Sequence, residues 1–414
     1  MEVVLLIICG FTLAYCMFAQ RLSRTVLTAP MLFIGFGVAL SYAGVVADEA
    51  AEEALRLVAE IALVILLFLD ASQINIAQLK GNRHQAVRML LIGLPLGVLF
   101  GTAAAFPFLE GWPLPAIALV AAILTPTDAA LGQAVVTNKN VPEADRRTLT
   151  IESGLNDGLA LPIILLFACM TAGAMEVPGS EGLSWLGFAA LQLTLGPIAG
   201  IFVGYLGGRA LVWAQDKELT SETFEGAAAL ALAGAAYLLA TEIGGNGFIA
   251  AFVAGLGFGN VVKDKCHFIF EFAESEGQIL VWGAFFLLGL ALVPEAISEL
   301  TPDMLAIILI SLFLVRPLAI WISLIGSKAP ALSRLFFGWF GPRGLATALF
   351  ALLIVSEYDH EFARQILNLA VNAVWISALL HGLTAVPAAV RYGAHMSSRR
   401  AEQDLEKAAV GGLK

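Results

Sequence analysis

The stretch Glu152-Ser153-Gly154-Leu155-Asn156-Asp157-Gly158 lies inside an apolar segment that runs from about Leu149 to Thr171. Such a segment is long enough to cross a bilayer as a helix, which takes about 20 residues. Carboxylates at membrane depth are costly unless they are paired or solvated, so they usually mark a path for ions or protons. Glu152 and Asp157 are therefore the first candidates for such a path.

The composition is that of a protein with many membrane spans. Of the 414 residues, 59% are hydrophobic and 14% are charged, and the mean hydropathy is +0.85. A soluble protein carries about 25% charged residues. The net charge of −10 argues against a nucleic-acid partner, which requires a basic surface. We expect an all-α polytopic membrane protein surrounded by membrane lipid.

Thirteen apolar segments can be drawn along the chain, with boundaries accurate to a few residues. They lie near residues 3–19, 29–46, 54–72, 86–108, 114–136, 148–172, 183–212, 222–242, 247–262, 271–294, 303–325, 332–356 and 363–390.

The lysine and arginine positions orient these segments. Basic residues follow every odd-numbered segment, for example Arg21 and Arg24 after the first, whereas the other junctions are acidic. Basic loops stay in the cytoplasm. Thirteen spans with the N-terminus outside and the C-terminus in the cytoplasm satisfy this rule at every loop. We therefore expect a multi-pass protein of the cell inner (plasma) membrane, with a short, frayed cytoplasmic tail over residues 392–414.

Two segments carry helix breakers near their middle. The fifth contains Thr125-Pro126-Thr127-Asp128, and the twelfth contains Gly341-Pro342-Arg343-Gly344. Non-helical backbone survives at membrane depth only inside protein or beside water. If segments 1–6 and 8–13 are two repeats, each break falls in the fifth helix of its repeat, and the repeats have inverted topology. Paired broken helices of this kind indicate a secondary transporter, although two ordinary proline kinks are the simpler alternative.

The side chains of the sixth segment divide between two faces. Ser153, Asn156 and Asp157 fall within an arc of about 100°, whereas Glu152 points about 140° away from Asp157. Asp157 and Ser153 can therefore offer oxygen ligands to a monovalent cation. Glu152 can pair with Arg316, a guanidinium that would be costly at membrane depth without a partner. Because desolvation favours the protonated form of a carboxyl group, Asp157 can hold either a proton or a cation.

Four other ionisable residues can lie at membrane depth: Asp70, Asp128, Arg343 and His381. Asp128 and Arg343 stand at the two breaks, where half-helix ends expose amides and carbonyls. We expect Asp128 beside the amides and Arg343 beside the carbonyls. Asp70, near the cytoplasmic end of segment three, either assists the cation or faces water at the interface. Of the five histidines only His381 could lie deep in a span, so a histidine pH sensor is not expected.

Four motifs together resemble the NhaP-like branch of the monovalent cation:proton antiporters. They are Thr-Pro-Thr-Asp at 125–128, Glu-Ser-Gly-Leu-Asn-Asp-Gly at 152–158, Arg-Pro at 316–317 and Gly-Pro-Arg-Gly-Leu at 341–345. The motifs occur in the family's order over nearly the whole chain, and the Asn-Asp pair after Glu-Ser is the most specific of them.

The resemblance implies a thirteen-helix homodimer that exchanges Na⁺ or Li⁺ for H⁺ by alternating access and without a cofactor. It implies a moving core, formed by helices 4–6 (residues 86–172) and helices 11–13 (residues 303–391). The core would move against a dimerisation scaffold, formed by helices 1–3 (residues 1–80) and helices 7–10 (residues 183–295).

The resemblance also implies the ligands of the transported ion. Asp157 would bind Na⁺ and the proton, with Ser153 and the Thr127 backbone as further ligands of Na⁺. Asp70 stands where several relatives have glutamate, which leaves its role as a ligand open.

The remaining motif residues would support this site. Asn156 would orient it, and Glu152 would form a stabilising ion pair with Arg316. The related branch with two adjacent aspartates is generally electrogenic. The single carboxylate beside Asn156 therefore implies electroneutral one-for-one exchange.

Three alternatives remain from the sequence. A K⁺/H⁺ antiporter could use the same fold. A cation channel would move ions faster than alternating access allows and without obligatory proton coupling. A membrane enzyme is disfavoured, because the sequence contains no cluster of His or Cys for a metal, no Ser-His pair at depth and no nucleotide motif.

Overall fold

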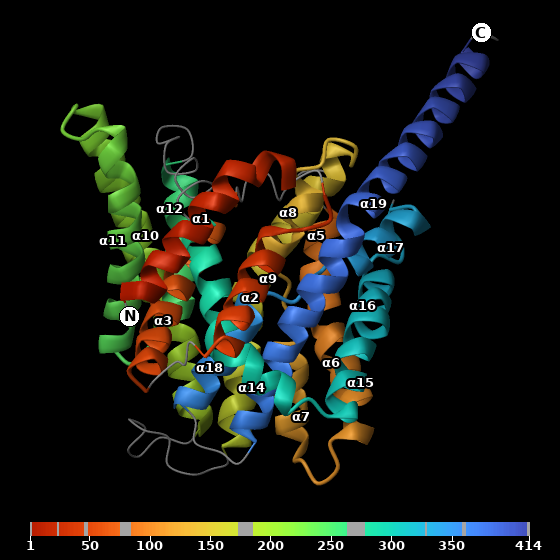
Figure 1. Ribbon diagram of the computed structural model, residues 1–414. Coiled ribbons are helices and arrows are strands. Elements are labelled where there is room, and N and C mark those ends of the chain that lie inside the picture. The colour runs from red at the N-terminus through yellow and green to blue at the C-terminus, as the bar shows by residue number, and fades with distance from the viewer. Residues whose placement is uncertain are drawn as a thin grey trace.

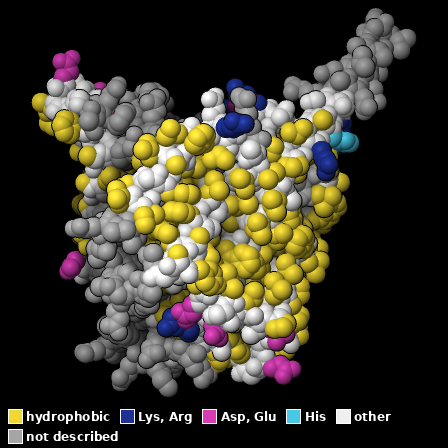
Figure 2. Space-filling view, in the orientation of Figure 1, with side chains coloured by type: hydrophobic (Ala, Val, Ile, Leu, Met, Phe, Trp, Pro, Cys, Tyr) yellow, Lys and Arg dark blue, Asp and Glu magenta, His cyan; other side chains and the backbone are white. Residues whose placement is uncertain are grey.

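The computed structural model describes residues 2–22, 25–44, 49–74, 84–172, 185–262, 278–327, 329–357 and 362–411. Within these ranges all regular structure is helical, and seven helices are long and apolar enough to cross a membrane. Hydrophobic side chains form a broad band on the face shown in Figure 2, and most charged side chains there gather at its two ends. Residues 75–83, 173–184 and 263–277, which carry part of the predicted charge pattern, lie outside the described residues.

Each predicted segment corresponds to a helix, a run of helices or a pair of half-helices. The first three segments are α1 (Glu2–Leu22), α2 (Ala29–Tyr42) and α3 (Glu49–Ser72). The fourth is the run of α5 (His84–Arg88), η1 (Met89–Gly93), α6 (Leu94–Ala105) and η2 (Phe106–Phe108). The fifth is the pair α7 (Leu114–Ile123) and α8 (Ala129–Val136), and the sixth is α9 (Glu143–Thr171). The seventh is α10 (Trp185–Asp216).

The last six segments follow the same plan (Figure 1). The eighth and ninth are α11 (Glu222–Glu242) and α12 (Gly247–Val262), and the tenth is the helix Gln278–Ser298, which includes η3 (Leu288–Leu292) and α14 (Val293–Ser298). The eleventh is the run of α15 (Pro302–Ile310), η4 (Ser311–Val315) and α16 (Arg316–Ser323). The twelfth is the pair α17 (Ala331–Trp339) and α18 (Leu345–Glu357), and the thirteenth is α19 (Ala363–Gly411).

Both predicted breaks are present. The chain is unwound between α7 and α8 at residues 124–128, and between α17 and α18 at residues 340–344. The two unwound segments meet, because the amide of Asp128 donates a hydrogen bond of 2.9 Å to the carbonyl of Pro342. The paired broken helices thus cross inside the protein, where each can supply polar partners for the other's free backbone groups.

A second feature repeats between the two halves of the chain. The π-helical turn η1 is followed by Leu94-Pro95, and the π-helical turn η4 is followed by Arg316-Pro317. Both lie in the fourth helix of their repeat. Proline lacks an amide proton and cannot bond to the carbonyl four residues earlier, which favours such a local widening of the helix. In the second repeat this turn directly precedes the buried Arg316.

Glycines let α12 pack closely against two other helices. A Cβ atom added at Gly204 of α10 would lie 2.2 Å from the carbonyl oxygen of Ala254, and one added at Gly255 of α12 would lie 2.1 Å from that of Phe68 on α3. Small residues allow helix backbones to approach in this way within membranes. The close contact holds α3, and with it Asp70, in a fixed position beside α12.

The predicted frayed tail is wrong. Helix α19 continues without interruption to Gly411 and extends beyond the bundle (Figure 1). Its last part is rich in Ala, Glu, Lys and Leu, which are strong helix formers. Where α19 leaves the bundle, Gly393 packs against the loop between α8 and α9, because a Cβ there would lie 2.1 Å from the carbonyl oxygen of Asn140.

Candidate functional site

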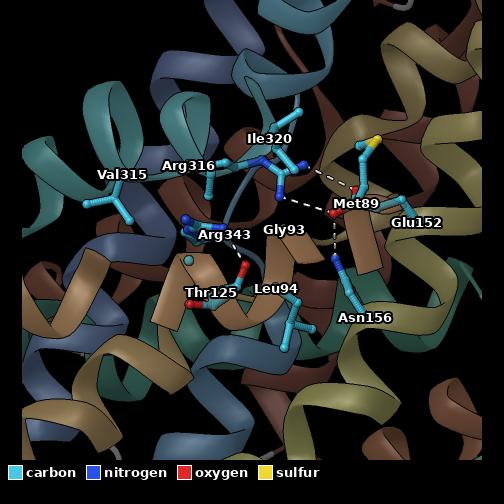
Figure 3. Close-up of a pocket in the computed structure, with 12 residues that line it drawn as sticks. Met89, Gly93, Leu94, Thr125, Glu152, Asn156, Val315, Arg316, Ile320 and Arg343 are labelled. Carbon is cyan, nitrogen blue, oxygen red and sulfur yellow. Dashed lines mark hydrogen bonds and ion pairs between the residues drawn. The ribbon is translucent and has the colours of Figure 1, made fainter. Parts of the chain in front are cut away.

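A buried ion pair joins α9 to α16. The two carboxylate oxygens of Glu152 lie 3.1 and 3.2 Å from the NH1 and NH2 nitrogens of Arg316, and the residues are only 3% and 6% exposed. This bidentate geometry is the strongest form of a carboxylate–guanidinium contact. Figure 3 shows the pair beside a small cavity of about 20 Å³. The structure therefore brings together the two residues that the sequence paired.

Two polar side chains donate hydrogen bonds to the Glu152 carboxylate, and a third contacts one of those two. Thr127, in the first unwound segment, donates to Glu152 Oε2 at 3.3 Å, and its hydroxyl lies 3.2 Å from that of Ser153. Asn156 donates through Nδ2 to the Thr127 hydroxyl and, at 3.4 Å, to Glu152 Oε1. Asn156 therefore connects α9 to the unwound segment, as a residue that orients the site would.

Asp128 caps the second half of both broken helices. Its Oδ1 accepts a hydrogen bond of 3.1 Å from the amide of Leu131 in α8, and its Oδ2 accepts one of 2.7 Å from the amide of Leu345 in α18. Helix N-termini leave amides without partners and carry partial positive charge. A single carboxylate thus compensates two half-helix N-termini, which is the position expected for Asp128.

Arg343 compensates backbone carbonyls beyond the C-terminal end of α7, whereas Asp128 compensates helix N-termini. Its NH1 donates to the carbonyls of Thr125 at 2.7 Å and Pro126 at 3.2 Å, just beyond the end of α7. Its NH2 donates to the hydroxyl of Ser311 at 3.3 Å. The side chain is 2% exposed. The guanidinium of one unwound segment therefore satisfies carbonyls of the other.

Asp157 faces a different cavity from the one beside Glu152. This cavity has a volume of about 70 Å³, enough for several water molecules, each of which needs roughly 10–15 Å³ by the same measure. Its lining residues are Leu63, Leu66, Leu67, Asp70, Asp128, Asp157, Val281, Leu345 and Ala346.

The chemistry of this cavity suits a cation. The Oδ1 atom of Asp157 is buried and has no hydrogen-bond partner, and among the described residues neither Asp157 nor Asp70 forms an ion pair with a basic side chain. Carboxylate oxygens and water are the ligands that hard cations prefer. Three carboxylates line this cavity, those of Asp70, Asp128 and Asp157. They repel one another, and either a cation or a proton relieves that repulsion.

The structure separates the predicted ligands into two groups. Asp70 and Asp157 share the larger cavity, whereas Ser153 and Thr127 hydrogen-bond to each other and are not among the residues that line it. Helical spacing placed Ser153 on the same side of α9 as Asp157, but it could not show that the unwound segment engages the Ser153 hydroxyl.

Sequence reasoning missed two polar residues of α19 that hold the second unwound segment. Ser377 accepts a hydrogen bond from the amide of Arg343 at 2.7 Å, and His381 lies 2.9 Å from the carbonyl oxygen of Trp339. The only signal in the sequence is their spacing of four residues, which puts both on one face of a helix.

We expect Gly344→Ala to destabilise the site. A Cβ atom at this position would lie 1.9 Å from Oδ2 of Asp128 and 2.1 Å from its Cβ, so the carboxylate must leave the half-helix ends. Each buried amide left without an acceptor costs about 1–3 kcal/mol. Thermal unfolding in detergent should show a lower Tm. The matched control is Gly132→Ala in α8, where an added Cβ meets nothing within 4 Å; an equal fall in Tm for both variants would contradict the argument.

The comparisons with known proteins agree with this architecture. The family described as "Sodium/hydrogen exchanger, transmembrane" matches residues 4–391. The chain is 29% identical over 339 residues to the K(+)/H(+) antiporter NhaP of Alkalimonas amylolytica, an alignment that covers 80% of this chain and 57% of that protein. It is 26% identical over 351 residues to the Na(+)/H(+) antiporter ApNhaP of Aphanothece halophytica, covering 80% of this chain and 63% of that one. The chain thus spans less than two thirds of these curated relatives.

A solved structure shares the fold. The sodium proton antiporter MjNhaP1 of Methanocaldococcus jannaschii, determined at pH 8, superposes with a TM-score of 0.76 over 95% of this chain and 100% of that one. Sequence identity between the two is 20%. The similarity therefore supports the helical arrangement described above.

Proposed function

The chain belongs to the sodium/hydrogen exchanger family of transmembrane proteins, and from this premise we propose that it is a secondary antiporter that exchanges a monovalent cation for protons. No cofactor is part of the proposal, because the cation and the proton are the substrates. The proposal extends to this chain an activity that the names of its relatives state for those proteins.

One observation carries the proposal. Asp157 has a buried oxygen without a hydrogen-bond partner and lines a cavity that it shares with Asp70. Two neighbouring carboxylates already have partners: Glu152 pairs with Arg316, and Asp128 accepts hydrogen bonds from two backbone amides. A carboxylate in this situation can take up a cation or a proton, and the two compete for it. Thr127 and Ser153 could join it as ligands after a small rearrangement of the unwound segment.

We propose Na⁺, with Li⁺ as an analogue, as the cation, and K⁺ as the alternative. Relatives are named for both ions: NhaP of Alkalimonas amylolytica for K⁺ and ApNhaP of Aphanothece halophytica for Na⁺. Because Asp157 is preceded by Asn156 rather than by a second acid, we propose electroneutral one-for-one exchange.

Alternating access would follow from the position of the cavity. Asp128 and Asp157 lie within residues 86–172, and Leu345 lies within residues 303–391, whereas Asp70 lies in α3. We assign residues 86–172 and 303–391 to a moving core and residues 1–80 and 183–295 to a scaffold that dimerises. Sliding of the core past α3 would expose the cavity to each side in turn. The charge pattern of the loops supports a plasma-membrane protein with its N-terminus outside and its C-terminus in the cytoplasm.

Exchange assays with several cations test the function directly. The protein is reconstituted in vesicles that contain a pH-sensitive dye, and proton movement is recorded after addition of Na⁺, Li⁺ or K⁺ at several pH values. Because cation and proton compete for one carboxylate, we expect the apparent KM for the cation to rise by up to about tenfold for each unit by which the pH falls.

The same vesicles distinguish the alternatives. Saturable exchange without net current supports one-for-one antiport, and exchange with K⁺ alone supports the potassium alternative. Cation flux that continues without proton movement would point to a channel, and the absence of any cation-dependent proton movement would contradict the proposal.

A further inference from the structure

Two residues of α19 bind the second unwound segment at both of its ends. His381 Nε2 lies 2.9 Å from the carbonyl oxygen of Trp339, the last residue of α17. Ser377 Oγ accepts a hydrogen bond of 2.7 Å from the amide of Arg343, two residues before α18 begins. Both side chains are buried, at 2% and 0% exposure. Two side chains one turn apart in α19 therefore hold the backbone on either side of residues 340–342.

The chemistry of each partner decides which atom donates in the hydrogen bonds of His381 and Ser377. The Trp339 carbonyl can only accept, so His381 Nε2 carries a proton. Ser377 Oγ accepts from the Arg343 amide and lies 3.0 Å from His381 Nδ1, so its own proton can be donated to that nitrogen. His381 Nδ1 also lies 2.9 Å from the backbone carbonyl oxygen of Ser377, so a proton on Nδ1 has an acceptor there, and without that proton Nδ1 accepts from Ser377 Oγ. The ring is further held by stacking on Trp339, with ring centroids 4.8 Å apart.

This connection reaches the wall of the Asp157 cavity. Arg343, whose amide Ser377 holds, donates through its side chain to the carbonyls of Thr125 and Pro126 in the first unwound segment. Immediately after Arg343 and Gly344, the residues Leu345 and Ala346 line the cavity together with Asp128. A shift of the second unwound segment would therefore displace both Asp128 and the start of α18.

We propose that Ser377 and His381 are positioning residues that fix the two unwound segments relative to each other and thereby set the shape of the cavity at Asp157. This role rests on the proposed antiport function in so far as it affects transport. The two residues do not touch the transported ion. They act through the backbone at Trp339 and Arg343.

The first test does not depend on transport. Hydrogen–deuterium exchange is measured by mass spectrometry on the full chain in lipid nanodiscs, for the parent and for Ser377→Ala. We expect faster exchange in peptides that cover residues 340–345 and, through Arg343, in peptides that cover 124–131. The control is Thr384→Val, about two turns beyond Ser377 in α19, which removes the partner of the Trp339 indole nitrogen at 3.0 Å but no bond to the unwound backbone.

The second test separates the two hydrogen bonds of His381 in the vesicle assay. Glutamine at position 381 can still donate to the Trp339 carbonyl, whereas asparagine can still accept from Ser377 but cannot reach that carbonyl. We expect Ser377→Ala and His381→Asn to raise the apparent KM for the cation by about tenfold, the effect of one lost buried hydrogen bond. His381→Gln should retain more of the parent's affinity, and Thr384→Val should leave it unchanged.

The outcomes are separable. Unchanged exchange of residues 340–345 and 124–131 in a folded Ser377→Ala protein would overturn the positioning role, whatever the transport result. Equal effects of Ser377→Ala and Thr384→Val on both peptides and KM would also overturn it, because general loosening of α19 would then suffice. If the parent shows no cation-dependent proton movement, the proposed function fails while the deuterium-exchange result still decides the positioning role.

Discussion

Asp157→Asn is expected to abolish cation–proton exchange, leaving only the leak of vesicles without protein. The substitution keeps the size of the side chain and removes the group that takes up either a proton or a cation. A carboxamide neither titrates nor carries the charge that offsets a dehydrated cation. The measurement is dye-reported proton movement in vesicles after a pulse of Na⁺, Li⁺ or K⁺, with equal amounts of folded protein verified by size-exclusion chromatography.

A matched control exists on the same helix. Asp145 lies in the first turn of α9 and accepts a hydrogen bond of 2.8 Å from Tyr392, which an asparagine oxygen can also accept. Asp145→Asn should therefore exchange cations as the parent does. If Asp157→Asn transported as well as the parent, Asp157 would not be the site of competition, and Asp70 would become the next carboxylate to replace.

Arg316→Met is expected to cause a large loss of stability. The methionine removes the guanidinium and leaves Glu152, at 3% exposure, without its charged partner. Breaking a buried ion pair by removing one partner costs about 3–5 kcal/mol. The carbonyl of Phe337, which accepts from Arg316 at 3.4 Å, loses a donor as well. Thermal unfolding in detergent should show a Tm lower by several degrees, together with poor recovery of folded protein.

The double variant Glu152→Gln/Arg316→Met tests the reason for that loss. Because neutral glutamine does not leave a buried charge, the double variant should recover part of the Tm that the single variant loses. The control is Arg364→Met, which removes a pair with Glu295 at 3.4 Å whose side chains are 64% and 44% exposed. Exposed pairs contribute about 0–1 kcal/mol. A Tm for Arg316→Met as high as that of Arg364→Met would show that the buried pair contributes no more than a surface pair.

These two predictions separate transport from stability within two turns of α9. Glu152 and Asp157 are five residues apart, and the structure assigns them to different cavities on different sides of the helix. The carboxylate of Glu152 is satisfied by Arg316 and Thr127, whereas Asp157 retains an oxygen without a partner. Loss of exchange with retained stability should therefore follow from a change at position 157, and loss of stability from a change at position 152 or its partner.

Local composition was sufficient to predict most of the architecture. The hydropathy of the chain predicted the helical segments, since a bilayer leaves helices as the simplest way to satisfy the backbone. Proline and glycine at 126 and 341–344 predicted where two of them unwind, because these residues act on the backbone at their own positions. Helical spacing predicted that Glu152 and Asp157 point in different directions, because that angle depends only on the geometry of one helix.

Contacts between distant segments were decided by the tertiary structure. Spacing along α9 could not show that Asp70 reaches the Asp157 cavity, because that depends on how closely α3 packs against α12. Nor could it show that Thr127 and Ser153 bind each other, or that Ser377 and His381 hold the second unwound segment. The sequence by itself determined which segments are helices, where they break and which charges lie at depth, since each of these depends on neighbouring residues. Only the packing of helices far apart in the chain decided which side chains share the cavity at Asp157 and which side chains hold the two unwound segments.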